Sequence, residues 1–564
     1  MMRETLRFLA SPVRGLQAAV YVLAASALLS SLLALVRDRL FAHTFGAGME
    51  LDLYYAAFRI PDFLFVATGA LVSVYILIPQ LARRTPEGQK RYIDAVVLAF
   101  SALAILASAI AAYAAPHLLR VLFPQFASED VLPTLTALTR ILLLQPILLG
   151  LSNVLAAVTQ SKHRYALYSL SPVLYNLGII SGLMLYFHFG IEALAWGVVF
   201  GAALHLGIQI PSVIHDGFFR SMPGRGDAWA LLETVAISIP RALALSMNQI
   251  TFLGLTAIAT SLAVGSLSVF MLSFNLMSVP LAVIGASYSV AAFPTLASAL
   301  SEGRAHDFLE HVSAAARYVL FWSLPAIALI IVLRAHLVRV VLGSGEFDWT
   351  DTRLTAAVFA LLSISLAGQG LTLLLTRAYY AAGRTFVPFF VAGGVAASTI
   401  ALASALNGLF ADAGVLHFVQ NLMRLGGVEG SSVLSLALAY STVSIAGVVV
   451  LILHFEHRFG GFVARIGTTF WQSTCAALAA GFAAYAALVF VGPLTLSSTV
   501  LSVFLKGLLG GVAGILGAAC MYLVFANREY LEIVSSVRGK LWRAPLPATQ
   551  PIASAEEISS SSPQ

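Results

Sequence analysis

The feature that most constrains this chain is a series of apolar runs that repeats from near the N-terminus to beyond residue 500. A helix of about 20 apolar residues crosses the hydrocarbon core of a bilayer, and each run is long enough to do so. Hydrophobic residues make up 59% of the chain and charged residues only 10%, with a mean hydropathy of +0.90. An average soluble domain has about 25% charged residues. This excludes a soluble globular enzyme and predicts an all-α, polytopic membrane protein.

The apolar runs predict about fourteen transmembrane helices, which leaves little sequence for any domain outside the membrane. The predicted spans cover residues 16–45, 52–81, 93–118, 134–158, 166–187, 193–215, 232–262, 267–297, 314–338, 354–376, 387–409, 431–454, 464–491 and 498–526. Between two late spans, residues 410–430 form a longer loop in which we expect a short amphipathic helix at about 415–425.

The distribution of positive charge predicts the orientation, because cytoplasmic loops are enriched in Lys and Arg. With the N-terminus in the cytoplasm, about 21 Lys and Arg residues fall on the cytoplasmic side and about five on the other. The five are Arg120, Arg334, Arg339, Arg353 and Arg424. This bias predicts a multi-pass protein with an even number of spans and both termini in the cytoplasm.

Several kinds of chemistry are missing from the sequence. None of the four lysines precedes Ser or Thr, so no nucleotide-binding loop ending in Gly-Lys-Ser/Thr is present. The two cysteines, Cys475 and Cys520, both fall in apolar runs, and no metal-ligand spacing occurs. We therefore expect no cofactor, no metal and no nucleic-acid partner, and an enzyme is disfavoured because no acid–base or nucleophile constellation stands out.

Ionisable residues inside the predicted spans gather in the first two. Such residues are costly in a membrane and usually face a cavity or a partner. The first two spans hold Arg37, Asp38, Arg39, Asp52, Arg59 and Asp62, and later spans hold Arg140, Arg241 and Lys506.

Two interpretations of these charges stay open. In one, spans 1 and 2 line a polar cavity where the planar fork of arginine grips a phosphate or carboxylate. In the other, the charges are solvated at a membrane interface. We favour binding for Arg37 and Arg59, and leave Arg39, Asp52 and Asp62 undecided. We expect Lys506 to reach the outer interface, and His205 to be a hydrogen-bonded packing residue.

The order of several motifs resembles the MurJ/MviN family, the peptidoglycan lipid II flippases of the MOP superfamily. The most specific stretch is LVRDRLFAHTFGAGMELDLYYAAFRIP at residues 35–61. Further similar stretches are SKHRY at 161–165, SPVLYN at 171–176, ALAWG at 193–197, HLGIQIP at 205–211, LGSGEFD at 342–348, DTRLTA at 351–356 and RAYYAAGRT at 377–385. The resemblance covers about residues 15 to 530.

The resemblance implies two six-helix lobes around a central cavity, plus two C-terminal helices that form a groove for a polyprenyl tail. The expected parts are an N-terminus at 1–15, an N-lobe at 16–215, a cytoplasmic linker at 216–231, a C-lobe at 232–454, the groove helices at 464–526 and a cytoplasmic tail at 527–564 that is disordered at its end. The implied cargo is an undecaprenyl-pyrophosphate-linked sugar-peptide.

The site residues implied by the resemblance are only partly present. Arg37, Asp38 and Asp52 match the family pattern, and Arg59 stands where Lys is common. Several charges usual in the family are replaced, at Ser31, Phe65, Val66, Thr68, Asn275 and Ser278. The candidate substrate-binding residues are Arg37, Asp38, Asp52, Arg59, Arg241 and Asn275, with Arg241 as the expected partner of Arg37 across the lobes.

Three functions remain open at this stage. The first is a flippase that moves lipid II from the inner to the outer leaflet of the bacterial cytoplasmic membrane by alternating access. The second is an exporter of the MOP type for another polyprenyl-linked glycan or an amphiphile. The third is a transport-inactive scaffold for cell-wall synthesis enzymes. The expected partners are the lipid-linked precursor, membrane lipids and, for the third function, those enzymes.

Overall fold

The computed structural model describes residues 16–541 apart from 70–71, 73, 163, 221–223 and 493–498. For some helical residues, Arg241 among them, only the backbone is described. The described part of the chain is helical and contains no β-strand. Eleven of its helices are long and apolar enough to cross a membrane. A bent pair, Trp349–Ser363 and Leu366–Ala381, adds a twelfth. The all-α membrane fold is therefore confirmed.

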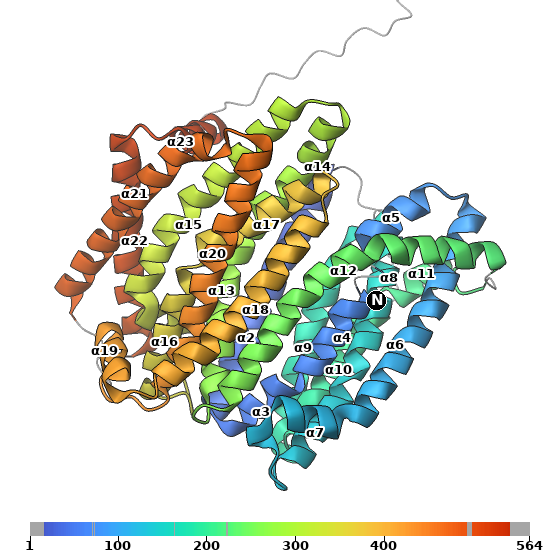
Figure 1. Cartoon of the computed structure of the whole chain (residues 1–564), viewed down its shortest axis with the longest axis horizontal. Helices are drawn as coiled ribbons and strands as arrows, with labels where there is room; N and C mark the ends of the chain where they lie inside the picture. Colours follow the sequence, from blue (N-terminus) through green and yellow to red (C-terminus); the bar gives the residue numbers. More distant parts are fainter. Residues whose placement is uncertain are drawn as a thin grey trace, which may run out of the picture.

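The first half of the chain forms one group of helices (blue to green in Figure 1). It contains α2 (Leu16–Phe45), α3 (Met49–Ala57), α4 (Arg59–Gly69), α5 (Val74–Ala82), α6 (Pro86–Leu122), η2 (Pro124–Phe126), α7 (Leu132–Leu142), α8 (Leu144–Ser161), α9 (Tyr165–Phe189), α10 (Glu192–Gly207) and α11 (Ile210–His215).

Glycines set the closest helix contact in this group, between α9 and α10. A Cβ at Gly178 would lie 2.2 Å from the Cα of Gly201, and one at Gly197 would lie 2.5 Å from the Cα of Gly182. Small residues let membrane helices approach backbone to backbone, where packing replaces the hydrophobic driving force.

The second half forms another group (green to orange in Figure 1). It contains α12 (Arg225–Thr260), α13 (Ser266–Leu281), the π-helical turn η3 (Ala282–Ala286), α14 (Ser287–Ser301), α15 (Ala305–Val341), α16 (Trp349–Ser363), α17 (Leu366–Ala381), α18 (Phe386–Leu409), α19 (Ala413–Met423), η4 (Ser431–Val433) and α20 (Leu434–Phe459).

The last helices are α21 (Phe462–Val491), α22 (Val500–Val524) and α23 (Arg528–Leu541). The two long ones pack against each other and against α15. A Cβ at Gly517 would lie 2.9 Å from the carbonyl oxygen of Ala479, so glycine again permits the close approach.

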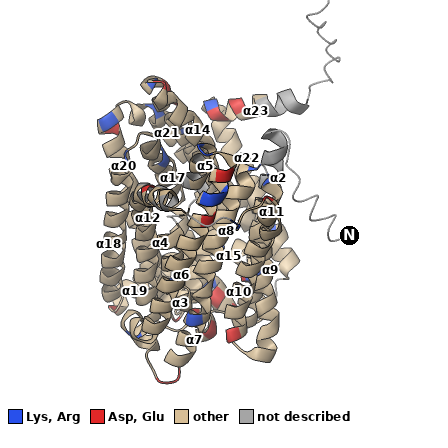
Figure 2. Cartoon of the chain, turned by 90° about the vertical axis from the view of Figure 1, so that its right-hand side faces the viewer, with Lys and Arg blue, Asp and Glu red and all other residues tan. Residues whose placement is uncertain are grey.

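The connections between helices gather at two opposite ends of the bundle (Figure 1). We call them the α3 end, with α3, α7 and α19, and the α23 end, with α5, α14 and α23. Figure 2 shows most charged residues toward these two ends, with uncharged residues along the length between them. This is the arrangement expected of a bundle whose middle lies in hydrocarbon.

The predicted second span, 52–81, is not one helix. Its described residues fall into three helices, α3, α4 and α5, and Phe58 lies at the break between the first two. Pro61 lies in the first turn of α4, where its missing N–H would in any case have no helical partner, so a helix start tolerates it. The described helices do not confirm the count of fourteen, because this broken stretch and α2 are not among the candidate spans.

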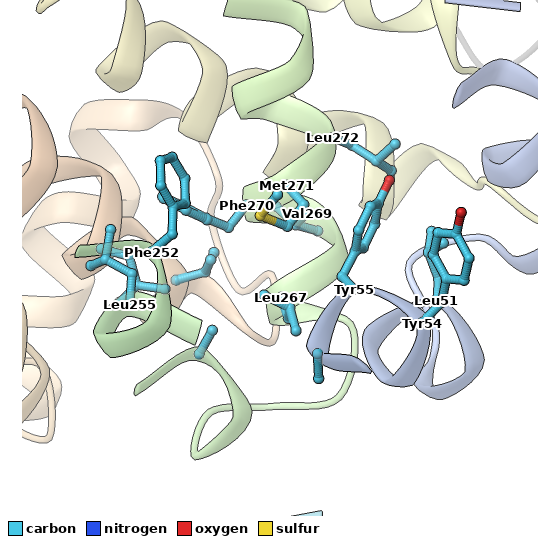
Figure 3. Close-up of a cluster of buried hydrophobic side chains, with 14 of the residues drawn as sticks. Leu51, Tyr54, Tyr55, Phe252, Leu255, Leu267, Val269, Phe270, Met271 and Leu272 are labelled. Carbon is cyan, nitrogen blue, oxygen red and sulfur yellow. The ribbon is translucent and has the colours of Figure 1, made fainter. Parts of the chain in front are cut away.

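The two halves meet at the α3 end through one cluster of buried apolar side chains (Figure 3). The side chains of Leu51, Tyr54 and Tyr55 on α3 lie on one side of α13, and those of Phe252 and Leu255 on α12 lie on the other. Toward the α23 end, α12 packs on α4 and α6 of the first half. There the hydroxyls of Tyr92 and Thr234 lie 2.8 Å apart.

The described helices add detail to the expected parts of the chain, whose boundaries stay predictions. Helix α12 begins at Arg225, so the expected linker 216–231 is partly helical. Helix α23 occupies the start of the expected tail. The short helix expected at about 415–425 is present as α19. Residues 1–15 and 542–564 lie outside the described residues, and the division into lobes stays a prediction.

Candidate binding site between the two halves

Arg37 and Asp38, late in α2, form the centre of a polar cluster. Arg37 donates from Nε and Nη2 to Oδ1 of Asp38, at 3.0 and 2.8 Å. Its Nη1 donates to Oδ1 of Asn176 on α9 at 3.1 Å. The arginine side chain is 20% exposed and the aspartate 5% exposed. The guanidinium is therefore held by one acid and one amide, with part of its surface still accessible.

Asn275 links this cluster to the second half of the chain. Its Nδ2, on α13, donates to Oδ2 of Asp38 at 3.1 Å. Asp38 therefore holds Arg37 with one carboxylate oxygen and α13 with the other. Arg37, Asp38 and Asn275, three of the residues predicted from the sequence, lie together.

Asn176 is a member of this cluster that the site prediction did not include. Its Nδ2 donates to the carbonyl of Pro172 at 3.0 Å, which fixes the amide with its oxygen toward Arg37. The signal was present in the sequence, since an asparagine inside an apolar span close to a proline is unusual, but nothing in the sequence placed it beside α2.

Asp52 lies apart from this cluster and caps a helix. It is 2% exposed, and its carboxylate accepts bonds from the backbone N–H groups of Gly265 and Ser268, each at 2.7 Å. The Ser268 hydroxyl donates to it at 2.5 Å. A carboxylate at a helix N-terminus satisfies free N–H groups and favours the helix dipole. In this conformation Asp52 fastens α3 to α13.

Arg59 is buried, 6% exposed, and bonds no carboxylate among the described residues. Its Nε donates to the carbonyl of Tyr55 at 3.1 Å, and its Nη2 lies 3.7 Å from Sδ of Met271. The guanidinium carbon lies 5.9 Å from the centre of the Phe252 ring, within the range of a cation–π contact. Arg59 therefore touches the second half of the chain at a different place from Arg37.

Two further predictions have different outcomes. The backbone of Arg241 lies in α12, directly after Pro240, but its side chain is outside the described residues. The partnership of Arg241 with Arg37 therefore stays a prediction. Nδ1 of His205 lies 2.7 Å from Oγ of Ser152, which confirms the expected hydrogen-bonded packing role.

Comparison with known proteins identifies the family. A family model described as "Lipid II flippase MurJ" matches residues 41–505. A "Probable lipid II flippase MurJ" of Thermotoga maritima is 28% identical over 456 residues, which span 78% of this chain and 90% of the relative. The "Lipid II flippase MurJ" of Burkholderia cenocepacia is 26% identical over 387 residues, or 65% and 74% of the two chains.

Solved structures agree on the fold. A structure titled "Lipid II flippase MurJ, inward closed conformation" has a TM-score of 0.72 at 20% identity, and the match covers 90% of this chain and 100% of that one. An inward-facing multidrug transporter of the MATE family in the MOP superfamily has a TM-score of 0.61 at 14% identity, over 79% and 99% of the two chains. Since the family model covers most of the sequence and its motifs occur in order, this chain belongs to the MurJ family.

Proposed function

We propose that this protein is a flippase that moves lipid II from the inner to the outer leaflet of the bacterial cytoplasmic membrane by alternating access. Its family and its named relatives support this. A multi-pass helical bundle suits a transporter better than an enzyme. The observation that carries the proposal is the hydrogen bond from Asn275 to Asp38. Asp38 also holds Arg37, so this bond connects the cation of the first half to α13 in the second half.

Arg37 is the proposed anion-binding residue. A guanidinium has five N–H donors, and three groups of this one bond Asp38 and Asn176. A phosphate oxygen can take the remaining donors or replace Asp38 as the acceptor. Such a replacement releases Asp38 from Arg37. The Asp38 carboxylate can then move, and its hydrogen bond from Asn275 weakens or breaks.

This competition is the proposed coupling between cargo and conformation. A ligand shifts a conformational equilibrium only through different affinities for the two states. A pyrophosphate that draws Arg37 away from Asp38 alters the contact between α2 and α13, which is a contact between the halves. Arg59 and Arg241 are proposed to add positive charge along the route, and Asp52 to position α13.

A second candidate is export of a different cargo. The low positive charge of the cluster favours it. Asp38 already neutralises Arg37, and an uncharged Asn275 stands where the family usually has Arg. A doubly charged pyrophosphate is normally bound by two or three fixed cations. A cargo with less charge would therefore suit this cluster better.

Genetic complementation separates these candidates. The gene is expressed in a strain depleted of its lipid II flippase, with Arg37→Ala as the matched inactive variant and membrane insertion measured for both. Rescue by the wild type alone supports lipid II as cargo. Rescue only of a strain that lacks a capsule or O-antigen flippase supports the second candidate. Normal insertion with neither rescue contradicts both, and favours a scaffold for cell-wall enzymes.

A further inference from the structure

A cavity of about 370 Å³ lies inside the second half of the chain, among α12, α13, α17, α18 and α20. Small-molecule sites typically enclose about 300 to 1,000 Å³, so one ligand group can fit. Two lining side chains, Leu245 and Asn248, are exposed, so the cavity opens to the outside of the protein.

The lining of this cavity is polar but uncharged. Asn248, Gln369, Thr376, Tyr440 and Ser444 all reach it, whereas its described lining contains no Asp, Glu, Lys, Arg or His. Burying an ion in such a place without a fixed counter-charge is unfavourable. The cavity therefore selects against charged ligand groups.

Several of these polar groups are free to bond a ligand. The side chains of Asn248, Thr376 and Ser444 make no hydrogen bond to any described residue. Gln369 is positioned by others, because its Nε2 donates to Oγ of Ser365 at 2.8 Å and its Oε1 accepts from the Tyr440 hydroxyl at 3.3 Å. The cavity thus offers an amide and two hydroxyls beside a fixed amide.

The remaining wall is apolar and includes two aromatic rings. Phe274 and Tyr440 meet edge to face, with ring centres 5.7 Å apart, and both line the cavity. A ring face suits the C–H face of a sugar, while the amide and hydroxyls suit its rim. An uncharged pyranose that carries an acetamide group has both kinds of surface.

The cavity is next to the arginine cluster. Phe274 and Asn275 are consecutive residues of α13, yet Phe274 lines the cavity and Asn275 bonds Asp38. Neighbouring positions of α13, about 1.5 Å apart along the helix axis, therefore face the cavity and the cluster of Arg37 and Asp38. A cargo with a sugar attached to a phosphate could occupy both at once.

We propose that this cavity binds an uncharged, acetamide-bearing sugar ring of the cargo, while Arg37 binds the phosphate. The inference rests on the proposed function, because it assigns a part of the same lipid-linked cargo to a second subsite. Asn248 is the residue expected to hydrogen-bond the sugar. Its side-chain amide lies at the opening of the cavity and bonds no described residue.

Binding of two lipids tests this assignment in the full-length protein in nanodiscs. The probes are lipid II and undecaprenyl pyrophosphate, which lacks the sugar. Asn248→Leu should weaken binding of lipid II about tenfold, as expected for lost hydrogen bonds, and leave binding of undecaprenyl pyrophosphate unchanged. Ser444→Val and Thr376→Val should act in the same direction. Asn421→Leu, an exposed position on α19 outside the cavity, is the matched control.

The outcomes separate this inference from the function it rests on. Equal affinity of wild type and all three cavity variants for lipid II, or an equal loss for both lipids, overturns the sugar subsite. A wild type that binds neither lipid contradicts the proposed function. The subsite is then decided by titration with chitobiose, a soluble disaccharide of N-acetylglucosamine. Binding that Asn248→Leu weakens supports the subsite, and no binding overturns it.

Discussion

At the scale of single residues, the structure brings together some of the side chains named from the sequence and separates others. The resemblance pointed to Arg37, Asp38 and Asn275, and these lie in one cluster. It also pointed to Asp52, which caps α13, and to Arg59, which lies elsewhere. Helical spacing says which face a residue occupies, but not which distant helix packs on that face, so these differences could not be predicted.

The two charges of the central cluster make a residue-scale prediction. Arg37→Ala should abolish transport, because it removes charge-assisted bonds worth about 3 kcal/mol, or about a hundredfold in cargo affinity. Arg37→Lys should only weaken transport, since a point charge remains but the planar fork is lost. The measurement is flipping of a fluorescent lipid II analogue in proteoliposomes.

Arg120→Ala is the control for this pair of variants, because Arg120 is exposed at the end of α6. If Arg37→Ala transports as fast as that control, Arg37 does not bind the cargo, and a pyrophosphate lipid is excluded as the cargo of this site.

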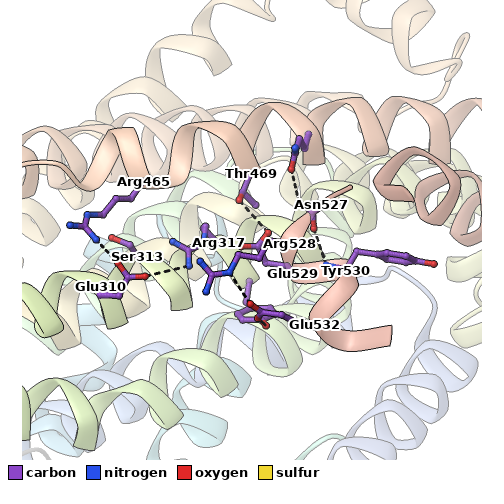
Figure 4. A network of polar contacts seen from close by, with 12 residues as sticks. Glu310, Ser313, Arg317, Arg465, Thr469, Asn527, Arg528, Glu529, Tyr530 and Glu532 are labelled. Atoms are coloured by element: carbon purple, nitrogen blue, oxygen red, sulfur yellow. Dashed lines mark hydrogen bonds and ion pairs between the residues drawn. The ribbon is translucent and has the colours of Figure 1, made fainter. Parts of the chain in front are cut away.

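At the scale of elements, the apolar pattern predicted the long helices well but missed α23. Its first turns hold several charges, and the sequence predicted only a cytoplasmic tail from residue 527 onward. The structure docks this helix through a polar network (Figure 4). Nε of Arg317 lies 2.8 Å from Oε1 of Glu529, which is 3% exposed. The pairing needs a residue more than 200 positions away, and no local pattern contains it.

The docking of α23 is predicted to depend on pH through Glu532, on its exposed face. Hydrogen bonds from the Tyr318 hydroxyl and the Arg528 guanidinium lower the pKa of Glu532 below its ordinary value of 4.5. A carboxyl with a lowered folded-state pKa stabilises the docked helix above its ordinary pKa, and loses that contribution as the pH falls through the lowered value. The effect is small because Glu532 is exposed.

Spin labels on Leu531→Cys in α23 and Val463→Cys in α21 measure this docking as a distance distribution. The distribution should be narrow at neutral pH and broaden only once the pH falls below 4.5, the ordinary pKa of a glutamate carboxyl. The additional variant Glu532→Gln should already be broader at neutral pH. If wild type keeps the same distribution throughout an acid titration, and Glu532→Gln has that distribution too, Glu532 has no part in docking.

At the scale of the whole molecule, the connections lie at two opposite ends, and which end faces the cytoplasm stays a prediction from charge. Arg164 forms an ion pair with Asp216, which joins two connections at one end, and Arg353 bonds the carbonyl of Arg424 at the other. Reporter fusions after Arg91, Arg225 and Arg384 should therefore report the cytoplasm, and fusions after Ala127 and Val415 the outside. A reporter active on the wrong side at any one of these five positions contradicts the topology.

Contacts between the halves close the α3 end in this conformation. Besides the Asp52 cap, Ala47 donates its backbone N–H to Oδ2 of Asp351 at 3.1 Å, and Glu346 donates its own to the carbonyl of His43 at 3.0 Å. All three contacts join the first half to the second. Alternating access requires this end to open, so these bonds must break during the cycle.

Cysteine labelling in detergent tests that requirement, with Cys475 and Cys520 first replaced by alanine. Ser266 is the probe position, because it is 2% exposed and its hydroxyl has no partner among the described residues, so Ser266→Cys disturbs little. It should react slowly with a maleimide, whereas Asn421→Cys, exposed on α19, reacts fast.

Adding Asp52→Ala removes a cap worth about 2 kcal/mol, which should enlarge the open population and speed labelling by up to about thirtyfold. If Ser266→Cys reacts as fast as Asn421→Cys before that change, the α3 end is not closed. An unchanged slow rate after it would mean that Asp52 does not hold the halves together.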